Sequence, residues 1–174
     1  MAATPAMVGA PLSVRAHEGG CPGCGAVLPA ADGPRHAYLG ASAACWALFH
    51  RLAPPPDRQR TKRLIHDAYA AQHPGVPSRR AVQSVAVHLM DLCLLLEHDG
   101  QSHRLEPVLG VMPRRRALDL HWLEPPATRG TVTIVDALHA RDDDERAARI
   151  DQWAQLVWDA WEPHHDTVRR WVGV

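Results

Sequence analysis

A loop that carries two closely spaced cysteines constrains this chain more than any other feature. Residues 19–44 are rich in Gly, Ala and Pro, show no steady hydrophobic period, and contain the motif Cys21-Pro22-Gly23-Cys24-Gly25. Two thiolates separated by two residues can bind one tetrahedral metal ion, and a Gly after the second Cys allows the backbone N–H groups to turn toward sulfur. Such a loop buries too little apolar surface to order itself. The motif therefore predicts a loop whose folding depends on a bound metal ion.

The remaining ligands must come from outside this motif, because the four cysteines of the chain form only one such pair. Cys45 is the third candidate, and His36 lies between it and Cys24. We therefore predict a closed zinc site formed by Cys21, Cys24, His36 and Cys45. Reserve candidates for the fourth ligand are His17, Asp32 and His50. If one protein ligand is absent, water fills its place and the metal becomes catalytic.

Two other interpretations of the cysteines stay open at this point. The Cys21–Cys24 pair can instead be a redox pair or two inert thiols. Cys93 lies in a Leu-rich segment, which predicts a buried residue that packs like a small hydrophobic side chain.

Length and charge limit the class of protein. The 174 residues are 46% hydrophobic and 22% charged, as in a globular domain. Nineteen basic residues balance nineteen acidic ones, so a non-specific nucleic-acid binder is disfavoured. No apolar run reaches the length of a membrane span, and residues 1–16 lack a secretory signal. We expect a cytoplasmic protein with a flexible tail over 1–18 and a single zinc-binding domain over 19–174.

Hydrophobic periodicity predicts a mostly α-helical fold. Helices are expected over 42–53, 57–73 and 79–97, from about 142 to 162, and again from Pro163. The predicted N-caps of the first three are Ser42, Asp57 and Ser78. Residues 100–130 are ambiguous, and 131–139 favour either a strand at Thr131–Val135 or a short helix from Thr133 to His139. The predicted architecture is an irregular four- to five-helix bundle with an N-terminal Cys-rich metal-binding loop.

Polar residues on two of these helices predict a second site. Tyr69 and His73 share one helix face, and Ser84 and His88 share one face of the next helix. The short connection over 74–77 makes the two helices antiparallel neighbours, so these groups can converge on one pocket with His121. In acid–base chemistry, His73 or His88 is the general base, and Tyr69 or His121 donates to an oxyanion. The predicted catalytic residues are Asp67, Tyr69, His73, His88 and His121.

The function predicted from these patterns is that of a zinc-binding enzyme acting on a small molecule. A lyase, cyclase or hydrolase of secondary metabolism is the type expected, because the chain has this network of polar residues and no redox-cofactor motif. It also has no nucleotide-binding or serine hydrolase motif. The alternative is a non-catalytic, zinc-stabilised module that binds protein or nucleic acid. A third possibility is that the histidine cluster holds a second metal ion, of iron, copper or zinc. For each polar residue, the alternative to a functional role is an ordinary local hydrogen bond at a helix end or on the surface.

The chain also resembles a bacterial family known mainly as a domain of unknown function. The resemblance rests on the strings CPGCGAVLPAADGPRHAY, ASAACWAL, DAYAAQHPGVPSRRAVQSVAVHL, HWLEPP and WEPHHDTVRRW and covers residues 20–172. One position departs from the family pattern, because Lys62 stands where members often carry His. The resemblance implies no reaction. It implies signature positions at Cys21, Cys24, His36, Cys45, Asp67, Tyr69, Gln72, His73, Ser84, His88, His121 and Trp122.

Overall fold

The computed structural model describes residues 20–52, 54, 58–98 and 118–174. Within these ranges the chain forms six α-helices and no strand, which confirms the mostly helical class with a Cys-bearing N-terminal loop. The expected tail over 1–18, the expected cap Asp57 and most of the ambiguous stretch over 100–130 lie outside the described residues. The helices are α1 (Ala43–Arg51), α2 (Gln59–Gln72), α3 (Arg79–Glu97), α6 (Ile134–Leu138), α7 (Asp143–Ala160) and α8 (His165–Val172), with a short 3₁₀ helix η2 (Glu162–His164) between the last two.

Capping side chains begin most of these helices. The hydroxyl of Ser42 accepts a hydrogen bond from the N–H of Cys45, and that of Ser78 accepts one from Ala81, as predicted for both caps. Thr133 and Asp136 form a reciprocal capping box at the start of α6. The short helix is therefore the correct alternative for this segment, and the predicted strand at Thr131–Val135 is wrong. Pro163 lies within η2 rather than at the first position of α8.

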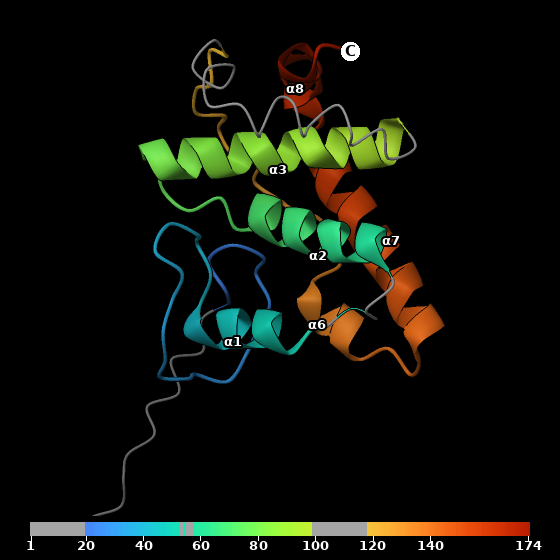
Figure 1. Ribbon diagram of the computed structural model, residues 1–174. Coiled ribbons are helices and arrows are strands. Elements are labelled where there is room, and N and C mark those ends of the chain that lie inside the picture. Colours follow the sequence, from blue (N-terminus) through green and yellow to red (C-terminus); the bar gives the residue numbers. More distant parts are fainter. Residues whose placement is uncertain (1–19, 53, 55–57, 99–117) are drawn as a thin grey trace, which may run out of the picture.

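The helices pack around α2. In Figure 1, α2 runs antiparallel to α3, and α7 crosses behind the right-hand end of α2; α2 contacts both. Helix α8 packs against α3, while the short α6 joins α7 to α1. Three tryptophans of the α7 region, Trp153, Trp158 and Trp161, are fully buried at the centre. Because large aromatic side chains remove much apolar surface from water, this core contributes strongly to the stability of the bundle.

Polar groups at the end of α2 are paired. The side-chain amide of Gln72 donates to the carbonyl oxygens of Arg129 and Val132 and accepts from the indole N–H of Trp153. The indole N–H of Trp161 donates to the Ala71 carbonyl. The end of α2 is thereby fixed to α7 and to the segment before α6. No helix in the described ranges combines the length and the apolar character needed to cross a membrane.

Candidate metal centre

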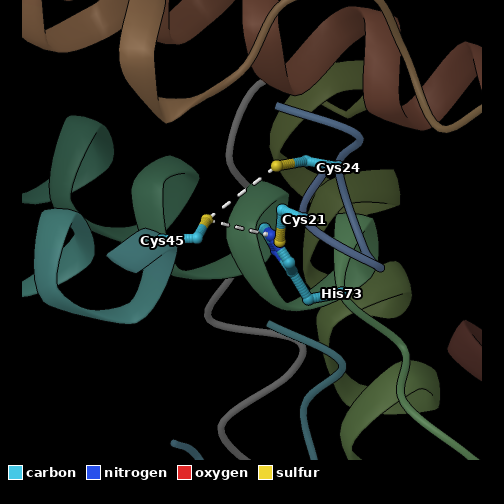
Figure 2. A group of neighbouring side chains, drawn as sticks. All are labelled: Cys21, Cys24, Cys45 and His73. Atoms are coloured by element: carbon cyan, nitrogen blue, oxygen red, sulfur yellow. Dashed lines mark hydrogen bonds between the residues drawn. The ribbon is translucent and has the colours of Figure 1, made fainter. Parts of the chain in front are cut away.

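Three cysteines and one histidine converge where the N-terminal loop meets the helices. Their ligand atoms, from Cys21, Cys24, Cys45 and His73, all lie within 4.8 Å of one another. The Sγ atom of Cys45 is 3.8 Å from Sγ of Cys24 and 3.4 Å from Nε2 of His73. Figure 2 shows the side chains pointing toward a common centre. Three sulfur atoms and one imidazole nitrogen form the donor set of a tetrahedral structural zinc site.

The two cysteines of the loop are placed by a tight turn. The N–H of Gly25 donates to the carbonyl of Cys21 at 2.8 Å, and the N–H of Cys21 donates to the carbonyl of Ala26 at 2.9 Å. Gly25 has a φ of 75°, a conformation that glycine adopts without steric cost. The N–H of Ser42 also donates to Sγ of Cys21 at 3.4 Å. A thiolate that accepts a backbone hydrogen bond keeps its charge more easily than an isolated one.

The other two ligands come from helix ends. Cys45 lies in the first turn of α1, and His73 is the residue that ends α2. The Nδ1 atom of His73 lies 2.6 Å from the carbonyl of Tyr69, which can only accept, so Nδ1 carries the hydrogen. In the neutral ring, the form that binds a metal ion, Nε2 therefore has the lone pair, and this atom faces Cys45. The arrangement matches the usual outer contact of a metal-binding histidine.

The pKa values of these groups are interdependent. Hydrogen bonds from Cys24 and Cys45 hold the pKa of Cys21 far below that of a free thiol, whereas hydrogen bonds to Cys21 and Cys24, together with burial, raise the pKa of Cys45. Burial lowers the pKa of His73, but the neighbouring Cys21 and Cys24 outweigh it and raise the value to about 9. The Cys21 thiolate is thus already favoured at neutral pH, whereas Cys45 needs a bound cation to ionise.

His36, the predicted fourth ligand, does not belong to this cluster. Its Nδ1 accepts hydrogen bonds from the N–H groups of Leu39 at 3.3 Å and Tyr38 at 3.5 Å, so the hydrogen of the neutral ring is on Nε2. The ring packs against Trp46, 4.8 Å between centroids. The structure thus places His73, which the sequence suggested as a catalytic residue, in the position expected of His36.

The reserve candidates are not part of the cluster either. His50 is exposed and its ring packs edge-on against Trp46. Asp32 is exposed in the loop, and His17 lies outside the described residues.

A cation lies behind the cysteine turn. The guanidinium of Arg129 donates to the carbonyl oxygens of Pro22 and Gly23, and burial lowers its pKa while the nearby Cys21 and Cys24 oppose this effect. A divalent ion with three thiolates carries a net charge of −1, so a guanidinium at this place offsets that charge. Gln72 holds the carbonyl of the same arginine.

Another group of possible ligands, Cys93, Glu97 and His98, lies at the end of α3. The Glu97 carboxylate already accepts from the indole of Trp158 and twice from Arg169. Burial raises the pKa of Cys93 to about 12, so it stays a thiol. This group is a weaker metal site than the first, and Cys93 is fully buried, as predicted for a small hydrophobic residue.

The five residues predicted to be catalytic fall in three places. Nδ1 of His88 lies 2.7 Å from Oδ1 of Asp67, and His88 lines a cavity of about 190 Å³ between α1, α2 and α3. Tyr69 separates this cavity from the metal centre, because its ring lines the cavity and its hydroxyl donates to Sγ of Cys45 at 3.6 Å. His73 belongs to the metal centre. His121 is exposed, packs against Trp171, and belongs to neither the cavity lining nor the ligand cluster.

Sequence reasoning missed one histidine of this cavity. His66, one turn before Ala70 on α2, lines the cavity with His36 and His88. The sequence could have indicated His66, because it lies three residues before Tyr69 on the same helix, and residues three apart on a helix share a face.

Comparisons with known proteins give a family but no function. No curated protein matches the chain, and no solved structure matches it. One family model matches residues 19–162, a span that includes all four candidate ligands and both members of the Asp67–His88 pair. The chain belongs to this family, DUF5946, a family of unknown function.

Proposed function

We propose that the protein binds one Zn²⁺ through Cys21, Cys24, Cys45 and His73, and that this ion is structural. The observation that carries the proposal is the free lone pair of His73 Nε2, held among three thiols by the Tyr69 carbonyl. Soft thiolates with one imidazole favour zinc over magnesium or calcium. Since the protein supplies four ligands, no coordination position is left for water or substrate.

The role of the ion follows from what it joins. The cysteine turn, the start of α1 and the end of α2 are separated along the chain and meet at these four side chains. The loop has little apolar burial of its own, and Val27 in it is 80% exposed. Zinc binding supplies the free energy that orders the loop against the helices. Three reduced cysteines are needed for this, so we place the protein in a reducing compartment, the cytoplasm.

The test is elemental analysis of untagged protein purified without added metal, together with a thermal melt with and without chelator. We expect one zinc per chain and a melting temperature that chelator lowers. His73→Ala should lose the zinc, because it removes a ligand, and His36→Ala should keep it. The two variants are matched, since each removes one half-buried or buried imidazole from the same region. Zinc retained by His73→Ala but lost from His36→Ala would overturn the ligand assignment.

A second function is favoured by the contact between Asp67 and His88. We propose that the cavity they line carries acid–base chemistry on a small molecule, of the lyase, cyclase or hydrolase type. Asp67 is 4% exposed and its Oδ2 has no hydrogen-bond partner among the described residues. A buried, incompletely paired carboxylate next to a histidine is costly for stability alone and is typical of functional sites. A metal-stabilised module that only binds protein or nucleic acid would show no dependence of turnover on His88.

A further inference from the structure

The cavity next to the metal centre has two compartments that meet at His88. The inner cavity, of about 190 Å³, is lined by aromatic side chains that include Trp46 and Phe49. A more open groove of about 440 Å³ lies outside it and is lined in part by Arg80. Tyr38, Ser84 and His88 line both compartments, so these residues mark the junction. A bound molecule would thus have an apolar end among aromatic rings and an anionic end near a guanidinium.

Two imidazoles at this cavity have opposite hydrogen-bonding roles. Nδ1 of His36 is occupied by the backbone N–H groups of Tyr38 and Leu39, which leaves Nε2–H as a donor. Nδ1 of His88 is held by Asp67, which leaves Nε2 as the ring nitrogen with no hydrogen bond to any described residue. The side chain of His88 is 26% exposed, although Asp67 beneath it is buried. The cavity therefore offers one fixed donor and one group able to accept a proton.

The charges around this pair set the pH at which it can accept a proton. Burial and the nearby Asp91 raise the pKa of Asp67, and Arg63 opposes this effect. Burial lowers the pKa of His88 to about 4; His66 and His36 add to this effect, and Asp91 opposes it. As pH rises through the raised pKa of the pair, it loses one proton, and the remaining one lies on Nδ1 facing an ionised carboxylate. The lone pair of Nε2 is then available toward the cavity.

We propose that this cavity binds a small 2-oxo acid and removes a proton from the carbon next to its oxo group, with His88 as base and His36 as hydrogen-bond donor. The inference deepens the second proposed function and does not depend on zinc being the metal. The carboxylate lies toward Arg80, the apolar end lies near Trp46 and Phe49, and the reacting carbon lies between them at the junction.

The proposed step needs no co-reactant. His88 Nε2 takes the proton of the C–H bond, and the electron pair of that bond forms a carbon–carbon double bond as the oxo group becomes an enolate oxygen. The Nε2–H of His36 donates to that oxygen, whose charge grows in the transition state. Return of the proton to carbon restores the oxo acid. In D₂O a deuteron returns to the carbon in place of the proton, so the replacement of this hydrogen by deuterium measures the step directly.

The experiment uses phenylpyruvate as the probe and the full chain with its metal. Proton NMR in D₂O follows the loss of the methylene signal. We expect exchange faster than in buffer and faster than with free imidazole at the same concentration. His88→Gln should slow the enzyme-dependent rate about 100-fold or more, and His36→Gln should also slow it. His139→Gln, which removes an exposed imidazole elsewhere, should leave the rate unchanged.

Asp67 acts through His88, so it is a positioning residue and its test is a pH profile. The wild-type rate should rise with pH through the raised pKa of the pair, and Asp67→Asn should lower the rate and remove this rise. Zinc content measured on each variant separates this proposal from the metal proposal. No exchange above buffer, or equal exchange in His88→Gln, would overturn the assignment, as would phenylpyruvate binding with no exchange.

Discussion

Gly23 lies directly on the ring of His73. A Cβ added at this glycine would lie 2.7 Å from Cγ of that ring and 2.8 Å from the carbonyl oxygen of Gly40, so neither side offers space. Gly23→Ala should therefore displace the imidazole from the three thiols without removing a ligand. We expect a 10- to 100-fold loss of zinc affinity, roughly the effect of disturbing the outer contacts of a metal ligand. Competition with a chromophoric chelator measures it.

Gly33→Ala is the matched control, because nothing lies within 4 Å of a Cβ at that position of the same loop. Both substitutions add the same methyl group and the same backbone restriction. Equal zinc affinity in the two variants would contradict the placement of the His73 ring.

The two histidines near the cysteines show what spacing along a sequence can predict. Spacing singled out Cys21, Cys24 and Cys45, and the structure brings these three together. It favoured His36 over His73, because His36 lies between the cysteines in the sequence. The two rings differ in which nitrogen has a lone pair available for a metal ion, and this depends on the partner of Nδ1. In His36 the partners are backbone N–H groups, whereas in His73 the partner is the Tyr69 carbonyl. No residue pattern encodes that partner.

At the level of the elements, the end of α2 depends on one buried amide. The amide NH₂ of Gln72 donates to the carbonyls of Arg129 and Val132, and its amide oxygen accepts from the indole N–H of Trp153. Gln72→Met keeps the length of the side chain but leaves the buried indole of Trp153 and the half-buried carbonyls of Arg129 and Val132 without this hydrogen bond. A stranded buried group costs roughly 1–3 kcal/mol, and partly exposed carbonyls cost less, so the free energy of unfolding should fall by about 2 kcal/mol or more. Urea denaturation measures this change.

The control for this substitution is Gln152→Met on the exposed face of α7. That change should alter the free energy of unfolding by less than about 0.5 kcal/mol, as is usual at the surface. A loss in Gln72→Met no larger than in the control would show that the amide does not fix α2 to α7.

Most helices were predictable because their signals are local. Ser42 and Ser78 cap α1 and α3, and the apolar positions of α7 that recur at helical spacing, among them Ile150 and Trp153, are buried. The segment over 131–139, which contains α6, was ambiguous because alternating β-branched residues also suit a strand. There the reciprocal hydrogen bonds of Thr133 and Asp136 favour a helix. Contacts such as that of Gln72 with Trp153 join distant residues, and no local pattern specifies them.

At the level of the whole molecule, two sources of stability lie next to each other. Most of the apolar core consists of residues from α2, α3, α7 and α8, with Trp153 and Trp158 among the most buried, and its edge includes the ligands Cys21 and Cys45. The N-terminal loop and the start of α1 meet the core at the candidate metal site. There the four ligands, rather than a large apolar contact, hold the loop against the helices. The stability of the bundle should therefore depend less on the ion than that of the loop does.

Hydrogen exchange with and without chelator tests this division. Removal of the metal should increase amide exchange in residues 20–41 and in α1, because their order depends on the ion, while α2, α3 and α7 keep most of their protection. The Cys21→Ser/Cys24→Ser double variant is the control, since chelator should change nothing in a chain that no longer holds the ion. Loss of protection throughout the bundle would instead mean that the ion stabilises the whole fold, as in a small zinc finger, and that the buried tryptophans do not suffice.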